Sequence, residues 1–170
     1  ATFNLYGNTM IRTLIVGLGD PILGDDGIGW KVAEQVSQRL ESDTNPLRIF
    51  PFLEVHCVSL GGLSLMERMV GYQRVILIDS MQTGQGEEGS IRVFALEELS
   101  NPYLGHSASA HDTSLMTALE MGRKTGLDLP DSVTVVAVEA RNVYEFSEEL
   151  SPPVASAVSD MVEAVLVALK

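Results

Sequence analysis

Three aspartates lie close together in a glycine-rich loop near the start of the chain. Asp20, Asp25 and Asp26 follow the short apolar run 14–16, and apolar residues then recur at helical spacing over 32–40. This pattern predicts a strand, a loop and a helix. Three carboxylates without a basic residue would repel a phosphate group, so the loop is suited to a cation.

Familiar nucleotide and hydrolase motifs are absent from this sequence. The dinucleotide fingerprint GxGxxG needs glycine where Ile22 stands, and the phosphate loop GxxxxGK[ST] needs lysine where Asp25 stands. There is no GxSxG or HExxH, and neither Asp79 nor Asp112 continues as Asp-[Ser/Thr]-Gly. Serine, zincin and aspartic-protease chemistries therefore lose support.

Two further residues that could bind a metal or take part in catalysis lie at expected element boundaries, one at the end of a strand and one at the start of a helix. Asp79 follows the segment 74–78, which is continuously apolar after its first residue, and His111 lies in or beside the first turn of a helix that starts near 109–112 and stops by Gly126. In parallel sheets, ligands bind beyond the carboxyl ends of the strands. A loop carboxylate, Asp79 and His111 could therefore converge, and two carboxylates with one neutral imidazole suit a borderline divalent metal.

Composition narrows the class of protein. The chain has 170 residues, a formal net charge of -12 and only 11 Lys plus Arg, which gives nucleic-acid binding little electrostatic support. The single cysteine, Cys57, excludes an internal disulfide and any multi-cysteine metal site. No apolar run reaches the length of a membrane helix, so we expect a soluble, cytoplasmic protein. We expect residues 1–9 to be a cloning remnant or loose extension and 10–170 to form one domain.

The order of apolar segments predicts a three-layer α/β/α domain with a mostly parallel five-stranded sheet. Connection 81–89 is too short for a crossover helix, so segment 90–94 should be an antiparallel edge strand. We expect the other strands near 14–16, 52–58, 74–78 and 133–138, and the helices near 32–40, 63–70, 111–125 and 154–169. Ser151 should cap the last helix, with prolines in its first turn.

Several stretches together resemble the hydrogenase maturation proteases, over about 12–170. They are Gly17-Leu18-Gly19-Asp20, Asp25-Asp26-Gly27-Ile28-Gly29, Ile78-Asp79, Ser109-Ala110-His111 and Leu150-Ser151-Pro152-Pro153. The resemblance implies an endopeptidase, of aspartic or metal-dependent type, that removes a C-terminal peptide from the nickel-loaded precursor of a nickel-iron hydrogenase large subunit. It implies that Asp26, Asp79 and His111 are both the catalytic and the metal-contacting residues.

The same resemblance implies that nickel arrives with the precursor, which would be the partner of the enzyme. We expect the enzyme itself to hold no permanent metal and to be a monomer. The family often has glutamate where this chain has Asp26, so the shorter side chain must approach the metal more closely or use a bridging water. Glu139, at the end of the last apolar strand, is a spare ligand.

Structural roles compete with these assignments. Asp25 and Asp26 would also serve as cap or first-turn acids of a helix, Asp79 could bond its own loop backbone, and His111 could simply begin a helix. Asp20 beside a proline is suited to a turn. Two other functions stay open: an intrinsic metallohydrolase with its own metal, and a non-catalytic Rossmann-like ligand-binding domain.

Overall fold

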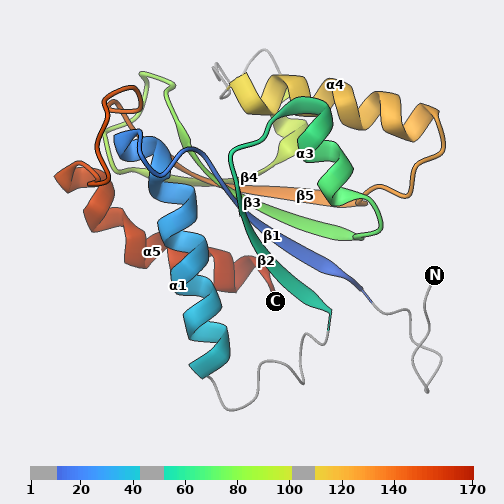
Figure 1. Cartoon of the computed structure of the whole chain (residues 1–170), viewed down its shortest axis with the longest axis horizontal. Helices are drawn as coiled ribbons and strands as arrows, with labels where there is room; N and C mark the ends of the chain where they lie inside the picture. Colours follow the sequence, from blue (N-terminus) through green and yellow to red (C-terminus); the bar gives the residue numbers. More distant parts are fainter. Residues whose placement is uncertain (1–10, 43–51, 101–109) are drawn as a thin grey trace.

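The computed structural model describes residues 11–42, 52–100 and 110–170, which form one five-stranded sheet between two layers of helices (Figure 1). The expected boundary between residues 9 and 10 lies outside this part of the chain. Strand order is β2-β1-β3-β5-β4, with every neighbouring pair parallel except β4 and β5. The strands are β1 (Thr13–Leu18), β2 (Leu53–Val58), β3 (Arg74–Met81), β4 (Ile91–Ala95) and β5 (Ser132–Glu139). The predicted fold class, including the antiparallel edge strand, is confirmed.

Helices cover both faces of the sheet. Helices α1 (Ile28–Ser42) and α5 (Pro152–Ala168) pack on one face, and α3 (Gly62–Met69) and α4 (Ala110–Lys124) pack on the other (Figure 1). Two short 3-10 helices, η1 (Gly24–Gly27) and η2 (Leu96–Ser100), lie in the connections. Within the described part of the chain, no helix is long and apolar enough to cross a membrane.

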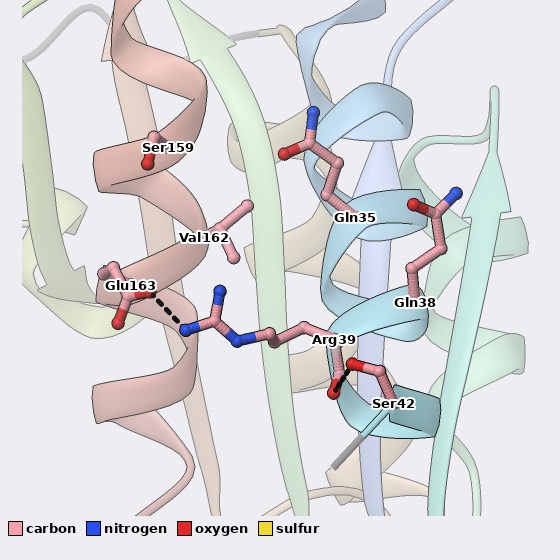
Figure 2. A pocket seen from close by; sticks show the side chains of 7 residues that line it. All are labelled: Gln35, Gln38, Arg39, Ser42, Ser159, Val162 and Glu163. Atoms are coloured by element: carbon pink, nitrogen blue, oxygen red, sulfur yellow. Dashed lines mark hydrogen bonds and ion pairs between the residues drawn. The ribbon is translucent and has the colours of Figure 1, made fainter.

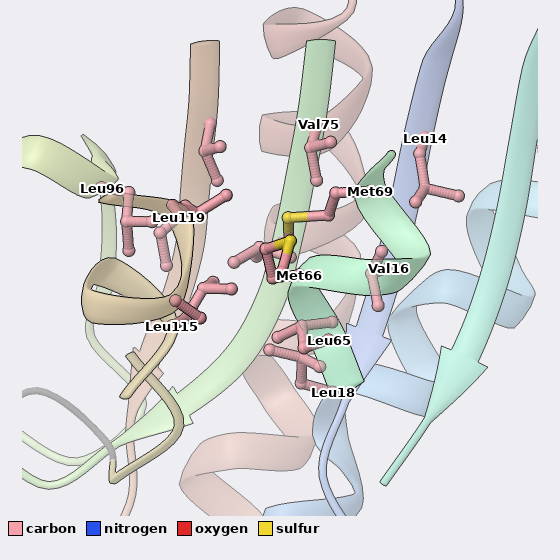
Figure 3. Packing of buried hydrophobic residues seen from close by; sticks show 14 of the residues in the cluster. Leu14, Val16, Leu18, Leu65, Met66, Met69, Val75, Leu96, Leu115 and Leu119 are labelled. Carbon is pink, nitrogen blue, oxygen red and sulfur yellow. The ribbon is translucent and has the colours of Figure 1, made fainter. Parts of the chain in front are cut away.

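Alternating side chains of the central strands fill two separate cores. In β1, Leu14, Val16 and Leu18 point toward the helices α3 and α4, as Figure 3 shows, while Ile15 joins the core beneath α1 and α5. This follows from the two-residue period of a strand, whose successive side chains lie on opposite faces. Because both faces are covered, central strands are apolar throughout, which is why they can be located from sequence.

Glycine lets the first helix begin directly against the sheet. A Cβ atom on Gly29 would collide with the main-chain oxygens of Leu18 and Ile78, and one on Gly17 would collide with the oxygen of Gly29. The absence of side chains at these two positions therefore allows the start of α1 to touch β1 and β3. This contact brings the first loop to the carboxyl ends of the central strands.

The end of strand β3 and the cap of helix α5 differ from the prediction. The sequence predicts that strand β3 ends at Asp79, but the strand continues to Met81, and Asp79 pairs with Ala137 inside the sheet. Polar side chains at 79 and 80 imitate the end of a strand, although both are buried here. The sequence also predicts that the Ser151 side chain caps α5; the residue occupies the cap position but makes no such bond, because its hydroxyl is directed to another partner.

Candidate active site

The first loop crosses the carboxyl end of the sheet in a tightly bonded path. Gly19 has a φ of 112°, which favours glycine, and its carbonyl accepts a hydrogen bond from the Ser59 hydroxyl at 2.7 Å. Asp20 Oδ1 then accepts the N–H of Ile22 at 3.1 Å, which makes an Asx turn. Asp20 is therefore a turn-forming residue, as its position beside proline indicates.

Asp26 lies in η1, immediately before α1, and is half-buried. Its Oδ2 atom accepts the backbone N–H of Asp20 at 2.7 Å. This bond runs backward across the loop, so the carboxylate ties the two ends of the loop together. The hydrogen bond holds the position of the side chain at the point where β1 passes into α1.

Asp25, the neighbouring acid, has a different environment. It is fully buried, and its two carboxylate oxygens accept hydrogen bonds from Ser151: the backbone N–H donates to Oδ1 at 2.7 Å and the hydroxyl donates to Oδ2 at 2.9 Å. Asp25 and Asp26 both lie in the first turn of η1, as the structural alternative expected, but the cap position belongs to Leu23. The Asp25 carboxylate connects η1 to the start of α5.

The segment between β5 and α5 also holds η1 through main-chain hydrogen bonds. The N–H of Asp25 donates to the oxygen of Asn142 at 2.8 Å, and the N–H of Gly24 donates to the oxygen of Ser147 at 2.7 Å. The N–H of Ser147 donates in turn to the oxygen of Ile22 at 3.0 Å. The position of Asp26 therefore depends on a segment more than a hundred residues away in the sequence.

Asp79 is buried in β3, with only 1% of its surface exposed. Its Oδ1 atom accepts the N–H of Ser80 at 2.8 Å, so the local backbone bond that competes with a ligand role is present. Asp79 has the same parity in the strand as Val75 and Leu77, and this is the face covered by α3 and α4. The carboxylate therefore lies on the side of the sheet from which α4 approaches.

His111 is the second residue of α4, as predicted, but its side chain lies outside the described residues, as does all of His106. The topology nevertheless fixes the end of the sheet to which His111 belongs. Helix α4 ends at Lys124, shortly before β5 begins at Ser132, so its first turn lies toward the carboxyl ends of the parallel strands (Figure 1). Asp26, Asp79 and the backbone of His111 thus share one end of the molecule.

Glu139, the spare metal ligand suggested by sequence, is used in another way. It is buried at the end of β5, where Oε2 accepts the hydroxyl of Thr83 at 2.6 Å and Oε1 accepts the N–H of Gly84 at 2.8 Å. These bonds fasten the connection between β3 and β4. Glu139 is therefore a structural acceptor in this conformation.

The one cysteine is poorly suited to act as a nucleophile. Burial, with a smaller contribution from the charge of Glu34, raises the pKa of the Cys57 thiol above its ordinary value. Its Sγ atom lies 3.9 Å from the carbonyl oxygen of Trp30. Because the thiolate is the reactive form, these surroundings oppose a cysteine-protease mechanism.

The described side chains do not form a complete metal site by themselves. Among them, no group of three or more His, Cys, Asp and Glu residues is arranged to hold a metal ion, and the imidazole of His111 is outside that set. The two remaining members of the predicted set, Asp26 and Asp79, supply oxygen donors. Such donors can complete the coordination of a metal that another molecule brings.

A groove of about 440 Å³ between α1 and α5 is separate from this end of the sheet (Figure 2). It is lined by Gln35, Gln38, Arg39, Ser42, Ser159, Val162 and Glu163. An ion pair crosses it, with Arg39 Nη2 3.4 Å from Glu163 Oε1. Since its α1 residues belong to the C-terminal half of that helix, the groove does not contribute to the acidic site.

The fold is an α/β domain, and Asp26 and Asp79 lie toward the carboxyl ends of its parallel strands, the end at which such sheets bind ligands. Comparison with known proteins then gives the family. Residues 53–168 match the family HycI, hydrogenase maturation protease. The chain belongs to the hydrogenase maturation protease family. The predicted family and enzyme class are confirmed: it is an endopeptidase that cleaves the C-terminus of a hydrogenase large-subunit precursor.

Individual relatives agree with this assignment over nearly the whole chain. The chain is 26% identical over 161 residues to the hydrogenase 2 maturation protease of Escherichia coli K12, covering 94% of this chain and 92% of the relative. Its fold is similar to the hydrogenase maturating endopeptidase HybD from E. coli, with a TM-score of 0.72 and 23% identity, covering 94% of this chain and 92% of that one.

A third relative comes from an archaeon. The hydrogenase 2 maturation peptidase from Thaumarchaeota archaeon SCGC_AB-539-E09 superimposes with a TM-score of 0.60 and 28% identity, covering 93% of this chain and 97% of that one. The likeness therefore extends over nearly the whole length of both chains.

Proposed function

We propose that this protease acts on a precursor that already carries nickel, and that Asp26, Asp79 and His111 contact that nickel. The observation that carries the proposal is the placement of the two acids. Asp26 follows β1 in a loop fixed against the sheet, and Asp79 lies near the carboxyl end of the adjacent strand β3. Helix α4 begins at the same end with His111 near its start.

The chemistry of these side chains agrees with a borderline divalent metal. Carboxylate oxygen and imidazole nitrogen are both accepted by such ions, whereas thiolates would come from the precursor. A metal held partly by the precursor needs few ligands from the protease, so recognition would depend on whether the precursor is loaded. The bound nickel could polarise the scissile carbonyl or report only that loading is complete.

The decisive experiment compares nickel-loaded and nickel-free large-subunit precursor as substrates. We expect cleavage of the loaded precursor and survival of the nickel-free precursor under the same conditions. Treating the protease alone with a chelator, and then removing the chelator, should leave its activity unchanged. Cleavage of nickel-free precursor, together with stoichiometric metal in the purified protease, would instead identify an intrinsic metallohydrolase.

We also propose that processing takes place in the cytoplasm and that the protease acts as a monomer. The acidic composition and the lack of a spanning helix in the described part of the chain agree with a freely diffusing enzyme. Cell fractionation and light scattering of the purified protein test these two points. Activity confined to membranes, or a stable dimer at working concentration, would contradict them.

A further inference from the structure

The two most exposed large apolar side chains in the described part of the chain lie on one segment, between β5 and α5. Phe146 is 85% exposed and Tyr144 is 80% exposed, whereas the next values are 63% for Val167 and Met121. Scattered exposed apolar residues are ordinary, but two nearly bare aromatic rings two positions apart are not. Aromatic rings of this kind are frequent energetic centres of protein interfaces.

The rings are not needed to hold their own segment in place. Val143 is buried in the core beneath α1 and α5, and main-chain hydrogen bonds join Asn142 and Ser147 to the first loop. The chain therefore keeps a fixed backbone beneath two side chains that face water. Fixed backbone is favourable for binding, because little conformational entropy is then lost when a partner docks.

This segment adjoins the proposed catalytic loop. Ser147 forms a parallel bridge with Leu23 and exchanges hydrogen bonds with Ile22 and Gly24, only a few residues before Asp26. Ile22 is itself 47% exposed. Tyr144 and Phe146 therefore belong to the segment that flanks the loop holding Asp26, and a substrate protein that reaches Asp26 would approach this segment.

We propose that the segment 142–149, with Tyr144 and Phe146 as its anchors, is a docking surface for the hydrogenase large-subunit precursor. This inference rests on the proposed substrate. Glu145, Glu148 and Glu149 are exposed on the same segment. The matching surface on the precursor should therefore be an apolar patch bordered by lysine or arginine side chains.

Charge also argues against a second copy of this chain as the occupant. The whole chain carries a formal net charge of -12, so two copies meeting through segments rich in glutamate would repel each other. A large precursor with a basic border avoids this cost. Because salt screens the attraction between the glutamates and this basic border, docking should weaken as the salt concentration is raised.

The test uses the full-length protease with Tyr144→Ser and Phe146→Ser combined. With nickel-loaded precursor we expect KM to rise at least about tenfold while kcat changes less than about twofold, because docking is lost and the chemistry is retained. The combined Tyr144→Phe and Phe146→Tyr variant keeps both rings and should restore the original KM. Val167→Ser, at one of the next most exposed large apolar residues and on α5, serves as the control and should have no effect.

Binding of nickel-free precursor separates this inference from nickel recognition. If the rings dock the protein surface, the serine variant should lose affinity for nickel-free precursor as well, even when nickel recognition has been disproved. Unchanged KM and affinity would overturn the proposal, as would an equal loss in the Val167→Ser control. A protease that sediments as a dimer only when both rings are present, with unchanged cleavage, would assign the rings to self-association and also overturn it.

Discussion

Ser151 and the buried carboxylate of Asp25 form a two-point contact across 126 residues of sequence, at 2.7 Å from the serine N–H and 2.9 Å from its hydroxyl. Asp25→Asn would place an amide N–H against one of these donors, and Asp25→Ala would leave both donors without their acceptors. We expect losses of about 1–3 kcal/mol for asparagine and more for alanine in the free energy of unfolding. Urea denaturation measures both.

The control for this contact is Asp131→Asn, an exposed acid beside β5. It should change the unfolding free energy by less than about 0.5 kcal/mol. If Asp25→Asn is equally mild, the carboxylate does not hold η1 to α5, and Asp25 is only an ordinary first-turn acid of η1.

Replacing Glu88, which also contacts Ser151, should raise the stability of the fold rather than lower it. Its Oε1 atom lies 3.2 Å from the Ser151 hydroxyl oxygen, which has one proton and a shorter contact with Asp25. Two carboxylates therefore compete for one donor. Glu88→Gln supplies an N–H and removes a like charge, so we expect a stability gain of up to about 1 kcal/mol, measured by the same denaturation. A loss of that size would mean that Glu88 is the preferred acceptor.

The sheet can be predicted because its signals are local. Covered strands are continuously apolar, and the short connection 81–89 is enough to place β4 antiparallel at the edge. The predicted end of β3 is wrong because Asp79 and Ser80 are polar, yet both are buried within the strand. Polarity marks a strand end only when the polar groups lack partners in the interior.

The site can be predicted as far as chain order allows. Asp26 and Asp79 lie at the same end of the sheet because parallel strands bring their carboxyl ends together. The role of Asp25 could not be found, since nothing local distinguishes an acid in a first turn from one bonded to Ser151. Tyr144 and Phe146 do leave a signal, as alternating aromatic residues among glutamates, and this pattern predicts exposure once the segment is recognised as a connection.

Gly29 should be among the least replaceable residues. A Cβ there would meet two backbone oxygens, at Leu18 and Ile78, and backbone in a central strand cannot move away. Gly29→Ala should cost at least about 3 kcal/mol or prevent folding, as severe overpacking does. Gly84→Ala is the matched control: its φ is 67° but it has nothing within 4 Å, so it should cost only about 1–2 kcal/mol of backbone strain. Thermal unfolding measures the stability of both variants, and the loss from the steric collision at Gly29 should exceed the loss from backbone strain at Gly84.

The thiol of Cys57 should react with an alkylating reagent only at a higher pH than an ordinary cysteine thiol does. Because burial raises its pKa, the thiolate fraction near neutral pH is smaller than for an ordinary cysteine, and alkylation by iodoacetamide should accelerate only at higher pH. Cys57→Ser should retain precursor cleavage. Rapid alkylation at neutral pH with loss of activity would contradict both the half-buried environment of the thiol and the exclusion of a cysteine nucleophile.

Asp26→Asn tests the proposed nickel contact most directly. In the present chain the backbone N–H of Asp20 donates to Asp26 Oδ2 at 2.7 Å. Asparagine keeps a carbonyl oxygen that can accept this hydrogen bond, so the loop should keep its conformation and the free energy of unfolding should change by less than about 1 kcal/mol. The amide is neutral and a poor metal ligand, so cleavage of nickel-loaded precursor should fall at least about a hundredfold. Asp26→Glu lengthens the side chain but keeps the charge, and should retain measurable cleavage. Because Asp25→Asn destabilises the fold through its Ser151 contact, its activity must be compared below its melting range. Loss of activity in proportion to lost stability, in both asparagine variants, would assign Asp26 a structural role instead.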